Sequence, residues 1–200
     1  MAVRPFLFFV GQTAGVPSGR MSFFCGTGKS TRMREPAPII LTATMARADF
    51  AWADGLRRAH FPPERNVVPA HISLFHHLPP GSLAELTDLM REAAAGPAPD
   101  AMLTDVMSLG RGVAFRVESP GLIAIRQRIA ERFHGLLTPQ DQHKPRLHIT
   151  VQNKVTSQEA RALHGALAAE FRPRPIRIAG LAAWYYRGGP WEAIAERRFR

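Results

Sequence analysis

The sequence predicts a mixed α+β fold with two similar lobes, in which mainly antiparallel sheets line a central cleft and helices cover the outer faces. Three observations predict it. A pattern of His, any residue, Ser or Thr, and an apolar residue occurs twice, at His71–Leu74 and at His148–Val151. Both occurrences lie within the same order of candidate strands and helices, which indicates an internal duplication. Apolar residues make up 46% of the 200 residues, enough for a core of this kind.

We interpret residues 36–109 as the first copy. It opens with the apolar run Pro38–Ala43, which is typical of a buried strand. Apolar residues then recur near one face of residues 46–60 and predict a helix. The first motif strand follows. After it, Ser82–Glu85 has the spacing of a capping box, so a second helix should begin there, and residues 101–109 should form the last strand.

Residues 110–200 repeat this order as the second copy. Residues 112–117 are mostly apolar and predict a strand. Ser119-Pro120 combines an N-cap residue with a proline suited to the first helical position, so a helix should begin there. After the second motif strand, Thr156–Glu159 offers another capping box, and residues 176–186 should form the last strand.

The first 35 residues differ from the rest of the chain. Gly26–Thr31 imitates a phosphate-binding loop, but a Walker A pattern needs Gly at position 23, where this chain has Phe23. Residues 32–36 also supply no apolar helix whose N-terminus could hold phosphates. We therefore predict that residues 1–35 form a flexible extension.

The two motifs offer the same pair of functional groups. Alternate side chains of an extended strand share a face, so His71 should lie beside Ser73. His148 should lie beside Thr150 in the same way. Facing each other, the two pairs would supply a proton acceptor, a proton donor and two hydroxyl hydrogen bonds around one tetrahedral group. This arrangement suits phosphodiester chemistry without a metal.

On these paired motifs, residues 36–200 resemble the 2H phosphoesterase superfamily, and within it the bacterial branch of 2′-5′ RNA ligases and RNA 2′,3′-cyclic phosphodiesterases. The resemblance implies a bilobal, pseudo-twofold fold with the active site in the cleft. It implies that His71 and His148 are the catalytic pair, and that Ser73 and Thr150 bind the phosphate. The implied reaction is hydrolysis of a 2′,3′-cyclic phosphate to a 2′-phosphate without a cofactor. The first motif has Ser where many members have Thr, which keeps the hydroxyl.

Strand alternation adds candidates for the substrate pocket, and one aromatic residue near the end of the last strand joins them. These candidates are Phe75 and His77 on the first motif strand, Arg146 and Lys154 on the second, and Tyr185. The basic residues would hold a phosphate, and the aromatic ones would stack on a base. Alternation sends His76 to the opposite face, and no Cys, Asp or Glu flanks either strand, so we expect no metal site.

Composition limits the class of protein further. The net charge of +10 favours a polyanionic partner such as RNA. No run of about eighteen apolar residues exists, so we expect no membrane span. The single cysteine, Cys25, excludes an internal disulfide and fits a reducing cytoplasm. We expect a cytoplasmic monomer that binds an RNA 3′ end or a nucleotide carrying a 2′,3′-cyclic phosphate.

Other functions stay open at this point. With the same four groups the chain could act as a 2′-5′ RNA ligase or on a small cyclic nucleotide. It could instead be a non-catalytic RNA-binding module that keeps the cleft. Turnover of a cyclic dinucleotide by the purified protein distinguishes the enzyme from the binding module.

Overall fold

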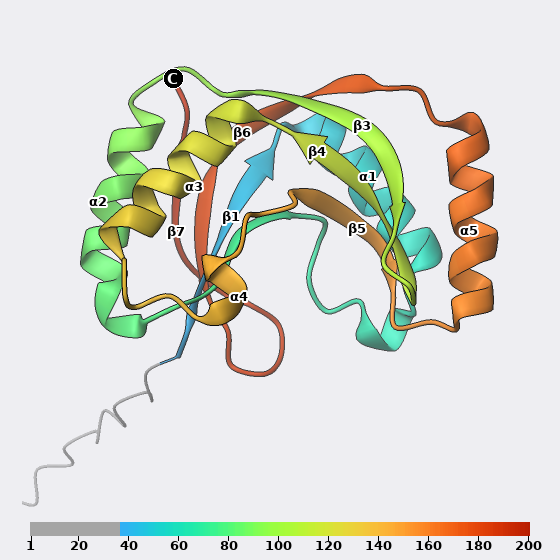
Figure 1. Cartoon of the computed structure of the whole chain (residues 1–200), viewed down its shortest axis with the longest axis horizontal. Coiled ribbons are helices and arrows are strands. Elements are labelled where there is room, and N and C mark those ends of the chain that lie inside the picture. The colour runs from blue at the N-terminus through green and yellow to red at the C-terminus, as the bar shows by residue number, and fades with distance from the viewer. Residues whose placement is uncertain (1–36) are drawn as a thin grey trace, which may run out of the picture. The chain divides into compact units, whose positions relative to one another are not determined.

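A computed structural model describes residues 37–200, in which the predicted strands and helices form in the predicted order (Figure 1). A short helix at residues 139–142 and a last strand at residues 192–198 were not predicted. The strands are β1 (Ile39–Met45), β2 (Ile72–Leu78), β3 (Asp100–Ser108), β4 (Gly112–Glu118), β5 (His148–Asn153), β6 (Arg174–Tyr185) and β7 (Glu192–Arg198). The helices are α1 (Arg47–His60), α2 (Leu83–Ala94), α3 (Pro120–Arg132), α4 (Pro139–Gln142) and α5 (Ser157–Glu170). The extension predicted for residues 1–35 lies outside the described residues.

The strand order shows the internal symmetry of the fold. All pairings are antiparallel, in the order β2-β1-β6-β3-β4-β5, with β7 paired to β6. In one half, the motif strand β2 is outermost, β1 of the same copy comes next, and β6, the last strand predicted for the other copy, is innermost. In the other half, β5, β4 and β3 take the same three places. The mixed α+β, two-lobed fold predicted from the duplication is therefore confirmed.

Strand β6 joins the two halves because it is long enough to pair in both. Its first residues, 174–177, pair with β3, and its remaining residues, 178–185, pair with β1. Strand β3 in turn leaves the first copy to pair with β4 of the second. The copies recognised in the sequence are thus interleaved in space, and neither is a lobe by itself.

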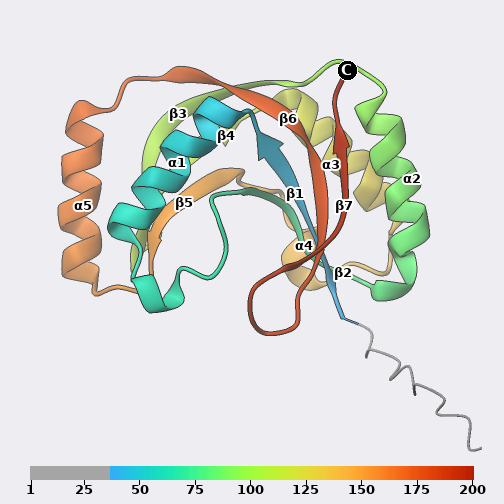
Figure 2. The same ribbon diagram turned by 180° about the vertical axis from the view of Figure 1, so that it is seen from behind.

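The helices exchange between halves in the same way. Helix α1 packs against β5 of the other copy, and α3 packs against β2 (Figures 1 and 2). Helix α5 covers β3 and β4. Phe115 of β4 packs between α1 and α5, 5.0 Å from Trp52 of α1 and 5.5 Å from Phe171 at the end of α5 between ring centroids. Within residues 37–200, no helix has the length and apolar character needed to cross a bilayer.

Local capping chemistry explains where the later helices begin. The Ser119 hydroxyl accepts a hydrogen bond from the Leu122 N–H, and Thr156 forms the predicted reciprocal capping box with Glu159. The capping box predicted at Ser82 is wrong. Ser82 lies in a short 3₁₀ turn (Pro80–Ser82) rather than in the extended conformation of an N-cap, so its hydroxyl caps no N–H.

Candidate active site

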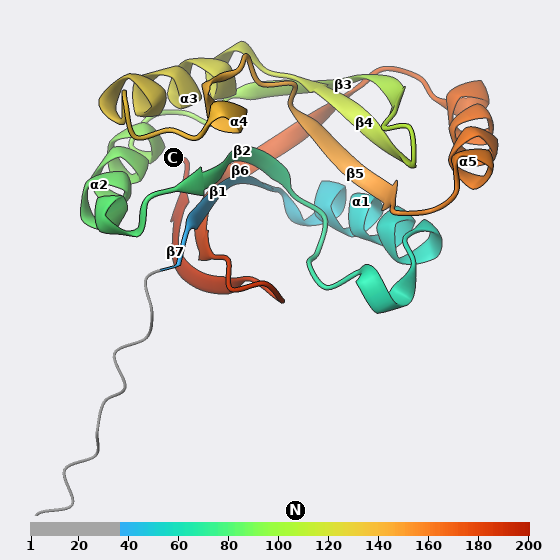
Figure 3. The same cartoon turned by 60° about the horizontal axis from the view of Figure 1, so that its bottom comes forward.

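The two motif strands come together although they stand at opposite ends of the strand order. The sheet bends across β6, and β2 and β5 are in contact (Figure 3). Burial alternates along both motifs as predicted. The His and hydroxyl positions are half-buried, and the four apolar residues between and after them are buried, namely Ile72, Leu74, Ile149 and Val151.

The two motif histidines are held in the same way. His71 Nδ1 lies 2.7 Å from the Pro69 carbonyl oxygen, and His148 Nδ1 lies 2.7 Å from the Arg146 carbonyl oxygen. A carbonyl oxygen only accepts, so each Nδ1 carries a proton and donates it. In the neutral ring, Nε2 is then the basic nitrogen. Each histidine therefore presents the same nitrogen for proton transfer.

The motif hydroxyls stand next to these rings and are uncommitted. Ser73 pairs with Thr42 of β1, and Thr150 pairs with Ala114 of β4. Neither hydroxyl forms a hydrogen bond within the part of the chain that the structure describes. Both are available to bind a ligand oxygen.

The surroundings of His71 favour its neutral form. Burial is the main cause that lowers its pKa from 6.5 to about 4, and the charges of Arg57, His148 and His76 lower it further, while the Pro69 carbonyl opposes them. The Trp191 ring, 4.5 Å from the His71 ring between centroids, contributes to this cover. His71 is thus a proton acceptor at neutral pH.

We expect this shift to appear in the stability of the protein. Between pH 6.5 and about 4 the unfolded chain protonates His71 and the folded chain does not, so the free energy of unfolding should fall as the pH falls through this range. On going from pH 6.5 to about 4, the variant His71→Gln should lose less unfolding free energy than the wild type does. Urea unfolding at both ends of this pH range would measure the two losses. His134→Gln, at an exposed histidine, should behave like the wild type. Equal losses in His71→Gln and wild type would contradict the shift.

A buried arginine, Arg57 of α1, links the two motifs. Only 4% of it is exposed. Its Nε donates to Asn66 Oδ1 at 2.7 Å and to the Val68 carbonyl at 3.0 Å, in the loop that leads to His71. Its Nη1 donates to the Thr150 carbonyl at 2.9 Å, on the opposite motif strand. Arg57 therefore fixes the approach to one motif against the backbone of the other.

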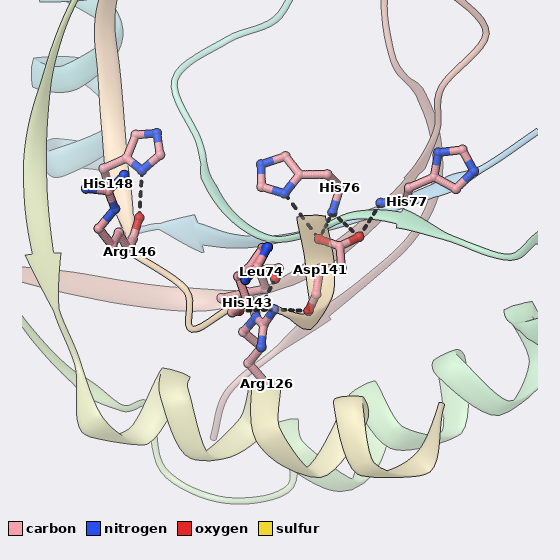
Figure 4. A network of polar contacts seen from close by, with 8 residues as sticks. All are labelled: Leu74, His76, His77, Arg126, Asp141, His143, Arg146 and His148. Carbon is pink, nitrogen blue, oxygen red and sulfur yellow. Dashed lines mark hydrogen bonds and ion pairs between the residues drawn. The ribbon is translucent and has the colours of Figure 1, made fainter. Parts of the chain in front are cut away.

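Arg126 of α3 does the same from the other copy (Figure 4). It is 7% exposed, and its Nε donates to the Leu74 carbonyl of β2 at 3.0 Å. Its Nη2 donates to the carbonyls of Asp141 and His143, in the segment that leads to His148. The two arginines form a pseudo-symmetric pair, each joining its own loop to the other copy's motif strand.

Asp141 of α4 adds a second link to β2. Its carboxylate accepts hydrogen bonds from the backbone N–H groups of His76 and His77 and contacts His76 Nδ1 at 3.3 Å (Figure 4). Burial would raise the pKa of Asp141, but these hydrogen bonds outweigh it and lower the pKa below its ordinary value. Over residues 37–200, no group of three His, Cys, Asp or Glu side chains is placed to hold a metal.

The predicted position of Phe75 in the pocket is wrong. Its side chain is 0% exposed and lies under the Arg126 guanidinium, 4.7 Å from the ring centroid. Register shifts between β1 and β2 break the alternation after Leu74, so that Leu74 and Phe75 are both buried. His77 is exposed, and in Figure 4 its ring lies on the side of Asp141 away from His148.

The two basic candidates for the substrate pocket, Arg146 and Lys154, lie at opposite ends of β5. Arg146 is exposed and stands beside His148, immediately before β5 (Figure 4). The position predicted for Lys154 on the His148 face is wrong, because β5 ends at Asn153. Lys154 occupies a left-handed turn with φ of 61°, about 20 Å along the chain from His148 at the usual rise per strand residue.

Tyr185 packs against the core and under Arg187, whose guanidinium lies 5.1 Å from its ring centroid. The aromatic residue beside the motif is instead Trp191, in the connection between β6 and β7. Trp184 lies behind it, 6.1 Å away between centroids. Sequence reasoning missed Trp191 because it stands outside any strand, after the turn signal Gly188–Pro190.

Comparison with known proteins gives a consistent result. The sequence profile of the 2′-5′ RNA ligase superfamily matches residues 46–190. No curated protein matches the chain in sequence.

Three solved structures are similar over 82% of this chain. TT0787 of Thermus thermophilus has a TM-score of 0.55 at 14% identity over 98% of its own length. E. coli LigT has a TM-score of 0.54 at 19% identity in a complex with 3′-AMP, and 0.51 at 15% identity in a complex with NADP+, each over 99% of its length. At these identities the likeness concerns the fold.

Proposed function

Because the chain belongs to the 2′-5′ RNA ligase superfamily, we propose that it is a phosphodiesterase that hydrolyses the 2′,3′-cyclic phosphate end of RNA or of a nucleotide to a 2′-phosphate. One observation carries the proposal. Two histidines at the starts of strands that meet, His71 just before β2 and His148 first in β5, are anchored identically through Nδ1, and a free hydroxyl follows each by two residues. Such a site holds a tetrahedral anion between two groups able to transfer protons.

The lowered pKa of His71 supports a role for His71 as the base and for His148 as the acid. His71 Nε2 takes a proton from water as the water oxygen bonds to phosphorus. His148 Nε2 donates a proton to O3′ as the P–O3′ bond breaks, so water is consumed and a 2′-phosphate with a free 3′-hydroxyl remains. The anionic substrate raises the pKa of the His71 imidazole, which brings it closer to the working pH.

Ser73 and Thr150 stabilise the charge that develops on the nonbridging oxygens. Their uncommitted hydroxyls flank the two imidazoles, so each can donate one hydrogen bond to the phosphoryl group. This division of work needs no metal ion. The complexes of E. coli LigT with 3′-AMP and NADP+ support a substrate that contains a nucleotide.

Turnover of a 2′,3′-cyclic dinucleotide in excess EDTA tests the proposal. We expect a product with a 2′-phosphate, identified by phosphorus NMR, at the rate seen without chelator. A protein with both His71 and His148 replaced by Ala is the control for contaminating nucleases. Binding without turnover by the wild type would favour an RNA-binding module, and loss of turnover in EDTA would overturn the metal-free reaction.

A further inference from the structure

A cavity opens beside the segment that leads into His148. It has a volume of about 860 Å³, within the usual range for a ligand site. Its walls come from the end of β4, the first half of α3 and the segment 144–147 that leads into β5. No residue of the two motifs lines it, so it is separate from the four groups assigned to the reaction.

The charged side chains of this cavity are mainly cationic, and Ser119 and Gln127 are its neutral polar ones. Arg116, Lys144 and Arg146 line it, and Glu118 is its one acidic residue. Within residues 37–200 none of these three cations forms an ion pair, although Asp105 of β3 lies opposite Arg116. Glu118 accepts a hydrogen bond from Thr104 Oγ1 at 3.2 Å instead. Three unpaired cations around one cavity favour an anionic ligand.

The cavity lies next to the reaction site. Arg116 pairs directly with His148 across β4 and β5, so their side chains share one face of the sheet. Arg146 precedes His148 by two residues and holds its Nδ1 through the backbone carbonyl. Lys144 lies farther along the same segment. A ligand whose reacting phosphate lies at His148 can therefore extend along these cations.

We propose that this cavity binds the nucleotide that precedes the reacting one in the RNA chain. Arg116, Lys144 and Arg146 then hold the phosphate that links the two nucleotides. The inference rests on the proposed function and narrows it to substrates of at least two nucleotides. A cyclic phosphate closes the 3′ end, so the rest of an RNA chain can continue only from the 5′ oxygen.

The other lining residues predict how the second base is held. Apolar groups form the wall between α3 and segment 144–147, contributed by Val117, Pro120, Ile123, Pro145 and Leu147. No aromatic ring lines this cavity, so no base is selected by stacking on it. The second nucleotide is thus recognised through its phosphate and through nonspecific apolar contact.

Comparing kcat/KM for a 2′,3′-cyclic dinucleotide with that for the cyclic mononucleotide tests the subsite. We expect a preference of about tenfold for the dinucleotide. Lys144→Glu should abolish most of this preference by reversing one charge. Ala124→Trp, at an exposed lining position, should reduce it by filling the cavity without changing charge. Arg161→Glu, at an exposed position on α5, is the matched charge reversal and should keep the wild-type preference.

Equal kcat/KM for the two substrates, or the same preference in Lys144→Glu and Arg161→Glu, would overturn the subsite while leaving the reaction intact. Calorimetric binding of a dinucleotide ending in a 2′-phosphate separates the two proposals. If no variant hydrolyses either substrate, the reaction is wrong. The subsite then stands if Lys144→Glu weakens dinucleotide binding about tenfold relative to Arg161→Glu, and fails if the two bind equally.

Discussion

An alanine at His71 or His148 should reduce turnover of a cyclic dinucleotide by at least about 10²-fold, because each substitution removes one partner of the proton transfer. Single-turnover rates of folded protein measure the effect. His134→Ala, at an exposed histidine, should keep wild-type rates. A His148→Ala protein that folds normally and turns over like the wild type would exclude His148 from catalysis.

The same variants test how the two roles are divided. The fold-loss of turnover in the double variant should be much smaller than the product of the two single fold-losses, because concerted proton transfer fails once either histidine is gone. The wild-type rate should form a bell against pH. If His71 is the base, His71→Ala should flatten the limb that rises from low pH, and His148→Ala should flatten the limb that falls at high pH. The opposite pattern would reverse the assignment.

The second large effect is expected at Arg57. Replacement by Ala removes a buried side chain and leaves the part-buried carbonyls of Val68 and Thr150 without this donor, which should cost about 2–5 kcal/mol of unfolding free energy. Urea unfolding measures this loss. Arg58→Ala, one residue along, should cost less than about 1 kcal/mol because the Arg58 side chain is 70% exposed, so its ion pair with Asp54 is open to solvent.

Arg57 also affects His71 directly, which separates its electrostatic role from packing. Its charge is one of the causes that lower the pKa of His71. Arg57→Gln should raise that pKa in an NMR titration, whereas Arg57→Lys keeps the charge and should leave it closer to the wild type. Arg126→Gln offers a matched control, because Arg126 is not among the groups that shift His71. Equal shifts in Arg57→Gln and Arg126→Gln would show a general loss of structure.

Local patterns in the sequence predict most of the elements. The two motifs indicated the family that the chain belongs to, and the Ser119-Pro120 and Thr156–Glu159 signals placed two helix starts. These succeed because alternation and capping depend on residues a few positions apart. The superfamily profile matches residues 46–190, within the region 36–200 that the motifs indicated.

The remaining features depend on distant parts of the chain. The burial of Phe75 follows from register shifts against β1, which strand alternation alone does not contain. The sequence holds only one weak sign that Arg57 and Arg126 are buried. Each lies four residues after a buried apolar residue of its helix, and so on the same helix face. Their carbonyl partners lie up to 93 residues away, so their function as links required the fold.

Because β6 belongs to both halves, the chain resists division into independent folding units. A cut between β3 and β4 would give fragments that each lack the innermost strand of their own half. Contacts of this kind are remote in sequence, so folding must close long loops before they form, and a slow, all-or-none transition follows. The two motif histidines are then brought together only in the last cooperative step, so partially folded molecules should show no turnover.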